Sequence, residues 1–243
     1  MRTIVLSLVG AALVQWALAA QTADDIIAKY VQTVGGMEKI RAVQTLRRTG
    51  KYTGGGGFEA QVLQESKRPN KVRQEFSLQG LTGINAYDGK TGWKIEPWQG
   101  KKDPEPLGED ELKDIVEAAD FDDQLVNYRD KGSKVDYEGL DQVEGSDAYK
   151  LKLTLANGDV RLYYLDTDAD VPIKVEMKRM IRGAEQEFET SLGDYKPVAG
   201  WYLPYSMETG RKGEDKAKIT YDKIEANVPI DDGRFEKPGS KTP

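Results

Sequence analysis

From Leu46 onward the sequence is a series of segments of about five to ten residues, separated by clusters of turn-forming residues. Asp88-Gly89-Lys90 and Asn157-Gly158-Asp159 are two of these clusters. Asn-Gly between apolar segments is the strongest short signal for a β-hairpin. The spacing is typical of antiparallel hairpins, and it predicts a meander of about 10–12 strands.

Three neighbouring segments alternate apolar and polar residues, which is the pattern of strands with one buried face. They begin at Tyr149, Val160 and Ile173. A curved sheet with a single apolar face must cover that face, and the space between the sheet and the helices that cover it would be a hydrophobic groove. We therefore expect a ligand-binding groove lined by Leu151, Leu153, Leu155, Leu162, Tyr164, Ile173, Val175 and Met177.

Two amphipathic helical segments are available to cover the sheet. The first begins after Thr22, a good N-cap residue, and ends at Gly35-Gly36. The second begins at the acidic run Glu109-Asp110-Glu111 and is expected to act as a lid through Leu112, Ile115, Val116 and Phe121. Three tryptophans are candidates for the mouth of the groove, each with core packing as the alternative: Trp93, Trp98 and Trp201. The predicted fold is mainly β with an α lid, a half-open antiparallel barrel whose concave face is covered by helices.

The first 20 residues have the pattern of a secretory signal peptide. Arg2 precedes an apolar run, and Ala17, Ala19 and Ala20 form a cleavage-site pattern before Gln21. We expect residues 21–243 to be one exported, soluble domain that does not span a membrane. The chain has no cysteine, so a lipid cannot be attached to one. Its net charge of −6 disfavours nucleic acid as a partner, because nucleic acid requires clustered Lys and Arg.

No reaction chemistry is apparent in the sequence. The chain has no histidine and no cysteine, which excludes Ser-His-Asp and Cys-His nucleophiles and zinc sites built on these residues. Asp166-Thr167-Asp168-Ala169-Asp170 has the spacing of the first calcium ligands of an EF-hand, but Val171 and Met177 stand where Gly and Glu are required. Acid pairs such as Asp122-Asp123 could serve a glycosidase, although nothing distinguishes one pair from another. We expect no catalytic residue, cofactor or metal.

Three segments resemble the outer-membrane lipoprotein-sorting proteins, the LolA-like periplasmic carriers. They are Tyr163-Tyr164-Leu165-Asp166 with Val171-Pro172-Ile173-Lys174, Gly200-Trp201-Tyr202-Leu203-Pro204, and Val228-Pro229-Ile230-Asp231-Asp232 followed by Phe235 and Pro238. The resemblance implies a half-open barrel with a helical lid that holds lipoprotein acyl chains in transit through the periplasm. It also implies membrane-bound donor and acceptor proteins, and we expect the chain to act as a monomer.

Three hypotheses about function follow. The first is a periplasmic carrier or chaperone that binds the acyl chains of lipoproteins or lipids for transfer toward the outer membrane. The second is a periplasmic sensor or regulatory module of the same fold that binds an envelope protein. The third is a secreted hydrolase that relies on carboxylates alone.

Overall fold

The computed structural model describes residues 21–181 and 184–239, so the predicted signal peptide lies outside the described residues. Helix α1 (Ala23–Thr33) begins after the predicted N-cap Thr22 with a capping box. The backbone N–H of Asp25 donates to the Thr22 hydroxyl, and the backbone N–H of Thr22 donates to the Asp25 carboxylate. Helix α2 (Gly36–Ala42) follows directly, and α3 (Glu109–Ala118) is the second predicted helix. Short 3₁₀ turns are η1 (Gly55–Gly57), η2 (Pro97–Gln99) and η3 (Asp232–Arg234).

The described residues form one antiparallel sheet of 13 strands, which confirms the predicted β architecture. The first half of the chain supplies β1 (Thr45–Thr53), β2 (Glu59–Lys67), β3 (Lys71–Leu78), β4 (Leu81–Tyr87), β5 (Gly92–Ile95) and β6 (Glu105–Pro106). The second half supplies β7 (Lys134–Val143), β8 (Ser146–Thr154), β9 (Val160–Asp166), β10 (Pro172–Ile181), β11 (Ala184–Val198), β12 (Trp201–Arg211) and β13 (Ala217–Ala226).

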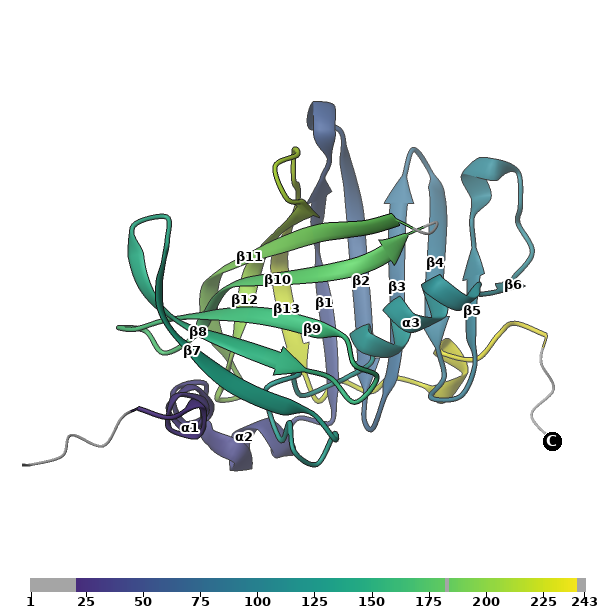
Figure 1. Ribbon diagram of the computed structural model, residues 1–243. Coiled ribbons are helices and arrows are strands. Elements are labelled where there is room, and N and C mark those ends of the chain that lie inside the picture. Colours follow the sequence, from purple (N-terminus) through teal and green to yellow (C-terminus); the bar gives the residue numbers. More distant parts are fainter. Residues whose placement is uncertain (1–20, 182–183, 240–243) are drawn as a thin grey trace, which may run out of the picture.

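Strands β1 and β13 pair in the middle of the sheet, which leaves β6 and β7 at its two edges. The sheet curls so that β9–β11 cross in front of β1–β3 (Figure 1). The chain leaves the β6 edge and must reach the β7 edge, so the connection 107–133 passes across the open side of the curled sheet. This route places α3 over the concave face, in contact with β4.

The main core fills one end of the curled sheet. Helices α1 and α2 and the segment that follows α3 pack there against β8, β9 and β12. Its fully buried side chains include Ile26, Ile40, Leu46, Leu125, Leu151, Leu153 and Leu165. The cores of proteins are close-packed, so this end of the sheet has little room for a ligand.

The C-terminal segment covers the convex face of the first half of the sheet. Phe235 is fully buried, and its carbonyl oxygen accepts a hydrogen bond of 2.7 Å from the Trp93 indole. Arg234 donates to Glu65 and Glu75, and the Glu65 carboxylate is 2% exposed. The segment therefore holds the outer layer of β2–β5 in place and leaves the concave face free.

Within residues 21–181 and 184–239, no helix is long and apolar enough to cross a membrane.

Candidate functional site: the concave cavity

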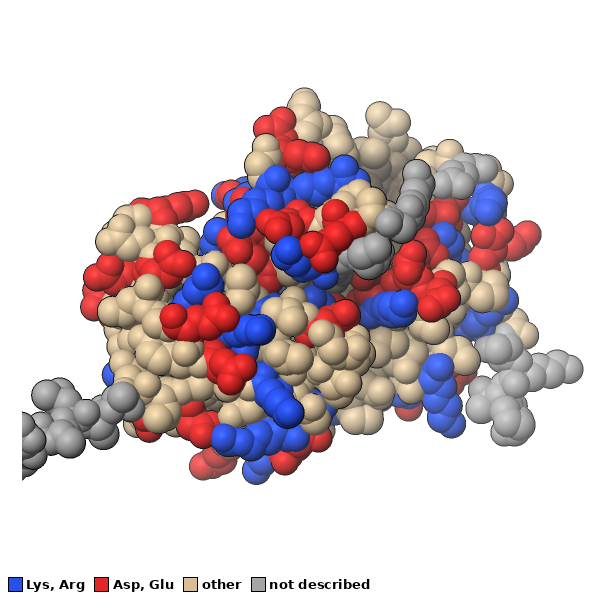
Figure 2. Space-filling view, viewed as in Figure 1, with Lys and Arg blue, Asp and Glu red and all other residues tan. Residues whose placement is uncertain are grey.

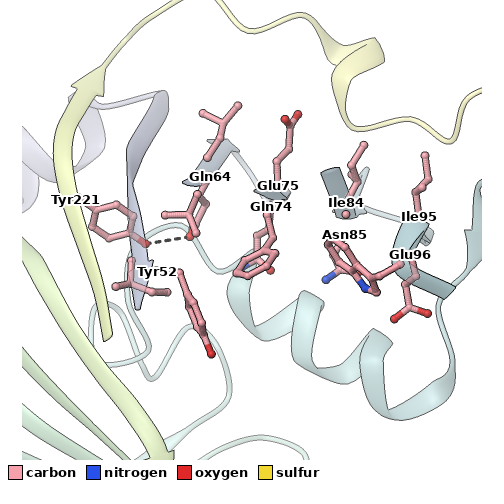
Figure 3. Close-up of a pocket in the computed structure, with 15 residues that line it drawn as sticks. Tyr52, Gln64, Gln74, Glu75, Ile84, Asn85, Ile95, Glu96 and Tyr221 are labelled. Carbon is pink, nitrogen blue, oxygen red and sulfur yellow. Dashed lines mark hydrogen bonds between the residues drawn. The ribbon is translucent and has the colours of Figure 1, made fainter. Parts of the chain in front are cut away.

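A cavity of about 370 Å³, here called the outer cavity, lies on the concave face over β1–β4 and β13. Its lining includes Tyr52, Val62, Gln64, Gln74, Phe76, Asn85, Trp98, Ile219 and Tyr221. Figure 3 shows that Asn85 and Glu96 point to the opposite side of the sheet from Glu75, Ile84 and Ile95. This is the part of the concave face that the main core does not fill.

A second cavity of about 220 Å³, the inner cavity, lies between the outer cavity and the main core. Gln64 lines both cavities, so they are neighbours. The inner cavity combines apolar and polar side chains, among them Tyr30, Leu46, Arg48, Ser66, Phe121, Asp123, Tyr195, Trp201 and Met207. The two cavities thus lie side by side on the concave face, with Gln64 in the wall of each.

Aromatic side chains form the outer edge of this space. The Tyr52 and Phe76 ring centroids are 5.2 Å apart and those of Phe76 and Trp98 are 5.7 Å apart, both edge to face. Gly83 makes room for Trp98, because a Cβ at Gly83 would come within 2.4 Å of the indole. Trp98 is 45% exposed, so an apolar ring remains partly open to solvent beside the cavity.

Helix α3 covers the sheet beside the outer cavity. Ile115 packs with Val72 and Tyr87, and Leu112 lies against Gly92, where a Cβ would come within 2.9 Å of its Cδ1. Val116 is 43% exposed and turned away from the sheet, because a residue next to buried Ile115 lies about 100° around the helix. The lid prediction is therefore corrected for Val116. Phe121 lies beyond the end of α3 and lines the inner cavity.

Arg68 ties the covering segments to the β2–β3 hairpin. Its guanidinium pairs with the Asp122 carboxylate, donates to the Val43 carbonyl at 2.7 Å and to the Ile40 carbonyl at 2.9 Å, and lies 4.4 Å from the Phe121 ring centroid. Both charged side chains are less than one fifth exposed. One side chain thus joins the sheet, α2 and the segment after α3.

Of the carboxyl groups that line the inner cavity, Asp123 has the pKa that departs most from its usual value. Burial raises the pKa of Asp123 to about 6, although the backbone N–H of Leu125 donates to its carboxylate and Lys131 acts in the opposite direction. The adjacent Asp122 is paired with Arg68, and Asp120 is paired with Lys131. The predicted Asp122-Asp123 pair therefore consists of one carboxylate that is paired with Arg68 and one partly buried carboxylate with a raised pKa.

Asp123→Asn is expected to stabilise the protein at pH 7.5 but not at pH 4. With a pKa near 6, the folded state binds a proton more tightly than the unfolded state, whose reference pKa is 3.8. The free energy of unfolding therefore falls as the pH rises through this window. The full shift corresponds to about 3 kcal/mol, and we expect about 1–2 kcal/mol because cavity solvent screens the charge. Asparagine also tolerates the positive φ of 71° at this position.

Urea unfolding of Asp123→Asn and the wild type at several pH values measures this difference, with Asp130→Asn, at an exposed position in the same segment, as the control. A stability difference that stays constant between pH 4 and pH 7.5 would contradict a raised pKa of Asp123 in the folded protein.

The residues predicted to line the groove divide between the two faces of the sheet. Register places Leu151, Leu153, Val175 and Met177 on the concave face, where Leu151, Leu153 and Val175 belong to the main core. Leu155 packs against that core, and Ile173 lies at a register shift in β10. Leu162 and Tyr164 lie on the convex face. None of the eight lines the outer or the inner cavity.

Strand β9 explains the error at Leu162 and Tyr164. Its two faces are both largely apolar, and the concave face carries Arg161, Tyr163 and the fully buried Leu165. Arg161 is buried because Glu117 of α3 pairs with it at 2.6 Å. Tyr164 is 5% exposed on the convex face because Lys150 and Lys174 lie over its ring. The prediction is corrected for these two residues.

The three predicted mouth tryptophans have different surroundings. Trp98 lines the outer cavity at its edge, and Trp201 is 3% exposed in the wall of the inner cavity, 6.1 Å from Phe121 between ring centroids. Trp93 is 1% exposed under the C-terminal segment on the convex face, so the prediction is wrong for Trp93. The register of β5 accounts for this, since Trp93 pairs with Ala86 rather than with Asn85.

The outer surface of the second half of the sheet carries interleaved charges. Figure 2 shows Lys and Arg next to Asp and Glu across the viewed face. Lys174 contacts Glu176 and Glu189, and Lys216 also contacts Glu189. No group of three or more potential metal-ligating residues is found in the part of the chain that the structure describes. Asp166, in the calcium-like segment, instead accepts hydrogen bonds from the backbone of Asp168 and Ala169.

Comparison with known proteins gives matches in structure but not in sequence. No protein-family model matches the chain, and no curated protein sequence matches it. A DUF1329 family protein from Desulfovibrio piger has a TM-score of 0.62 and 13% identity, over 88% of this chain and 96% of that chain. An outer membrane lipoprotein-sorting domain from Vibrio parahaemolyticus has a TM-score of 0.59 and 12% identity, over 88% and 95%.

A LolA superfamily protein from Nitrosomonas europaea has a TM-score of 0.57 and 14% identity, over 90% of this chain and 99% of that chain. At such identities the likeness concerns the fold, and it extends over most of the described residues. The curled 13-stranded sheet, its helical cover and these structural neighbours show that the chain has the LolA-like fold.

Proposed function

We propose that this protein is an exported carrier that binds the acyl chain of a lipid or lipoprotein in the concave cavity, without catalysis. The observation that supports this most strongly is the outer cavity itself. It lies on the concave face, it is bounded by Tyr52, Phe76 and Trp98, and its volume of about 370 Å³ falls within the range of ligand sites. The proposal places the ligand over β1–β4 rather than over β8–β10, where the main core lies.

The energetics of acyl binding suit a carrier with an imperfect cavity. Burying an acyl chain of about sixteen carbons gives about 12 kcal/mol before ordering costs, at about 0.8 kcal/mol per methylene. A carrier must release its cargo, so part of the free energy gained by burying the acyl chain has to be offset by unfavourable contacts in the cavity. The polar side chains Gln64, Gln74 and Asn85 in the wall reduce the apolar contact and thereby favour release.

We also propose where the protein acts. Residues 1–20 would direct export to the periplasm, where the chain would act as a monomer between membrane-bound donor and acceptor proteins. Support comes from the signal-peptide pattern and from the shared fold with a lipoprotein-sorting domain.

Displacement of a fluorescent fatty-acid probe from the purified mature protein tests the proposal. We expect the probe to bind with a micromolar or lower Kd and hexadecanol to displace it competitively, since a C16 chain is long enough to fill the outer cavity. Absence of probe binding, together with protein free of lipid in native mass spectrometry after gentle periplasmic extraction, would contradict it.

A further inference from the structure

A row of polar side chains crosses the concave face beside the aromatic edge. Arg48 of β1 pairs in register with Gln64 of β2, Gln64 with Gln74 of β3, Gln74 with Asn85 of β4, and Asn85 with Lys94 of β5. Residues directly opposite each other on antiparallel strands share a face. The five side chains, here called the polar row, therefore extend about 19 Å across five strands at about 4.8 Å per strand.

The amides of the polar row have few partners within the protein. The Tyr221 hydroxyl donates to Gln64 at 3.4 Å, a long contact, while the Gln74 and Asn85 side chains form no hydrogen bond to other described residues. Figure 3 shows Asn85 directed toward the same side as Glu96, away from Ile84. Their donors and acceptors are available to a ligand in the outer cavity.

Arg48 differs from three other arginines of the sheet. Arg47 is paired with Glu65, Arg73 with Glu75 and Arg161 with Glu117, each at 2.9 Å or less. Arg48 is partly buried, and it forms no ion pair or hydrogen bond with any other described residue. A partly buried guanidinium without a protein partner has donors that are free to bind an anionic ligand.

The surroundings of Arg48 leave its charge uncompensated. It lines the inner cavity beside Gln64 and Ser66, next to the outer cavity. The carboxylates of the inner cavity are engaged elsewhere, Asp120 with Lys131 and Asp123 with the backbone N–H of Leu125. Burial lowers the pKa of Arg48, and the titratable group found to act on it is the Tyr221 hydroxyl. A guanidinium is a planar fork of donors that matches an oxyanion.

We propose that Arg48 binds the anionic headgroup of an acyl amphiphile, a carboxylate or a phosphate ester, while the amides of the polar row bond its polar atoms and the acyl chain lies along Tyr52, Phe76 and Trp98. This inference rests on the proposed function and adds the chemical class of the ligand. An acyl chain alone would bind to any apolar cavity, whereas Arg48 would give a preference for ligands with an anionic headgroup.

Competition binding with three ligands of equal chain length tests the inference: hexadecanoate, hexadecyl phosphate and hexadecanol. In the wild type we expect at least one of the anions to bind ten times or more tightly than the neutral alcohol. In Arg48→Met and Arg48→Gln this preference should fall to within twofold, with hexadecanol affinity unchanged. Arg48→Lys should restore part of it, because a single ammonium replaces the fork.

The anion that binds more tightly identifies the source of the headgroup, fatty acid or phospholipid-like ester. Arg41→Met, at an exposed position on α2, is the matched control for loss of one positive charge. We also expect ligand-free Arg48→Met to have a Tm equal to or above that of the wild type, because it removes a partly buried charge that pairs with no described residue. This result would show that the loss of preference is not a loss of folding.

The possible results distinguish the headgroup inference from the proposed binding of an acyl chain. If all three ligands bind equally to the wild type, or if Arg48→Met and Arg48→Gln keep the anion preference, the headgroup inference is wrong and acyl binding stands. If none of the three binds, the proposed function itself fails.

Discussion

Asn85→Trp is expected to weaken acyl-chain binding at least tenfold while the protein stays folded. Asn85 is exposed on the concave face in the wall of the outer cavity, so an indole there has room but occupies the space of the ligand. The cavity holds about 370 Å³, of which a tryptophan side chain takes a large share. Probe displacement by hexadecanol measures the effect, and a tenfold loss corresponds to about 1.4 kcal/mol.

Thr82→Trp is the matched control for this variant. Thr82 lies on β4 with its side chain on the other side of the sheet from Asn85, and it does not line the outer cavity. The same substitution there should leave the Kd within twofold of the wild type. Equal affinity of the wild type and Asn85→Trp, or equal losses in both variants, would show that the outer cavity is not the binding site.

Arg68→Met should lower the free energy of unfolding by about 2–4 kcal/mol, somewhat less than breaking a fully buried ion pair, because both side chains keep some exposure. The substitution leaves the Asp122 carboxylate, which is 16% exposed, without its partner. It also leaves the Ile40 and Val43 carbonyls without the hydrogen bonds that Arg68 donates. Chemical denaturation with a two-state fit measures the change, and Arg41→Met should change the stability by less than about 0.5 kcal/mol.

The double variant Arg68→Met, Asp122→Leu isolates the charge from the hydrogen bonds. Removing both charges leaves no unpaired carboxylate, so part of the lost stability should return. A single Arg68→Met variant within 1 kcal/mol of the wild type would mean that Arg68 does not join the sheet to its cover.

The sequence predicted the architecture because hairpin strands are encoded locally. Asn157-Gly158 and the alternation of Tyr149, Leu151 and Leu153 set a turn and a strand face without help from the rest of the chain. The opening helix is similar, since Thr22 and Asp25 lie three residues apart. These signals act over a few residues, and the structure confirms the half-open β fold that they imply.

The site was harder to predict because it depends on pairing between distant segments. Strand β9 is largely apolar on both faces, and the one charged side chain on its concave face, Arg161, is buried in an ion pair with Glu117, 44 residues away. Arg48, Gln64 and Gln74 occupy inward positions that the alternation rule reserves for apolar residues. Polar residues at such positions weaken the strand signal, and they form a row only when β1, β2 and β3 are in register.

The most direct measurement of the central claim is photolabelling with a hexadecanoate analogue that carries a diazirine on its acyl chain, followed by peptide mapping. The account predicts labels on Tyr52, Phe76, Trp98 and their neighbours on β1–β4, and competition by excess hexadecanoate. Labels confined to β7–β10 around Leu151 and Leu153, or labelling that excess hexadecanoate does not reduce, would contradict it.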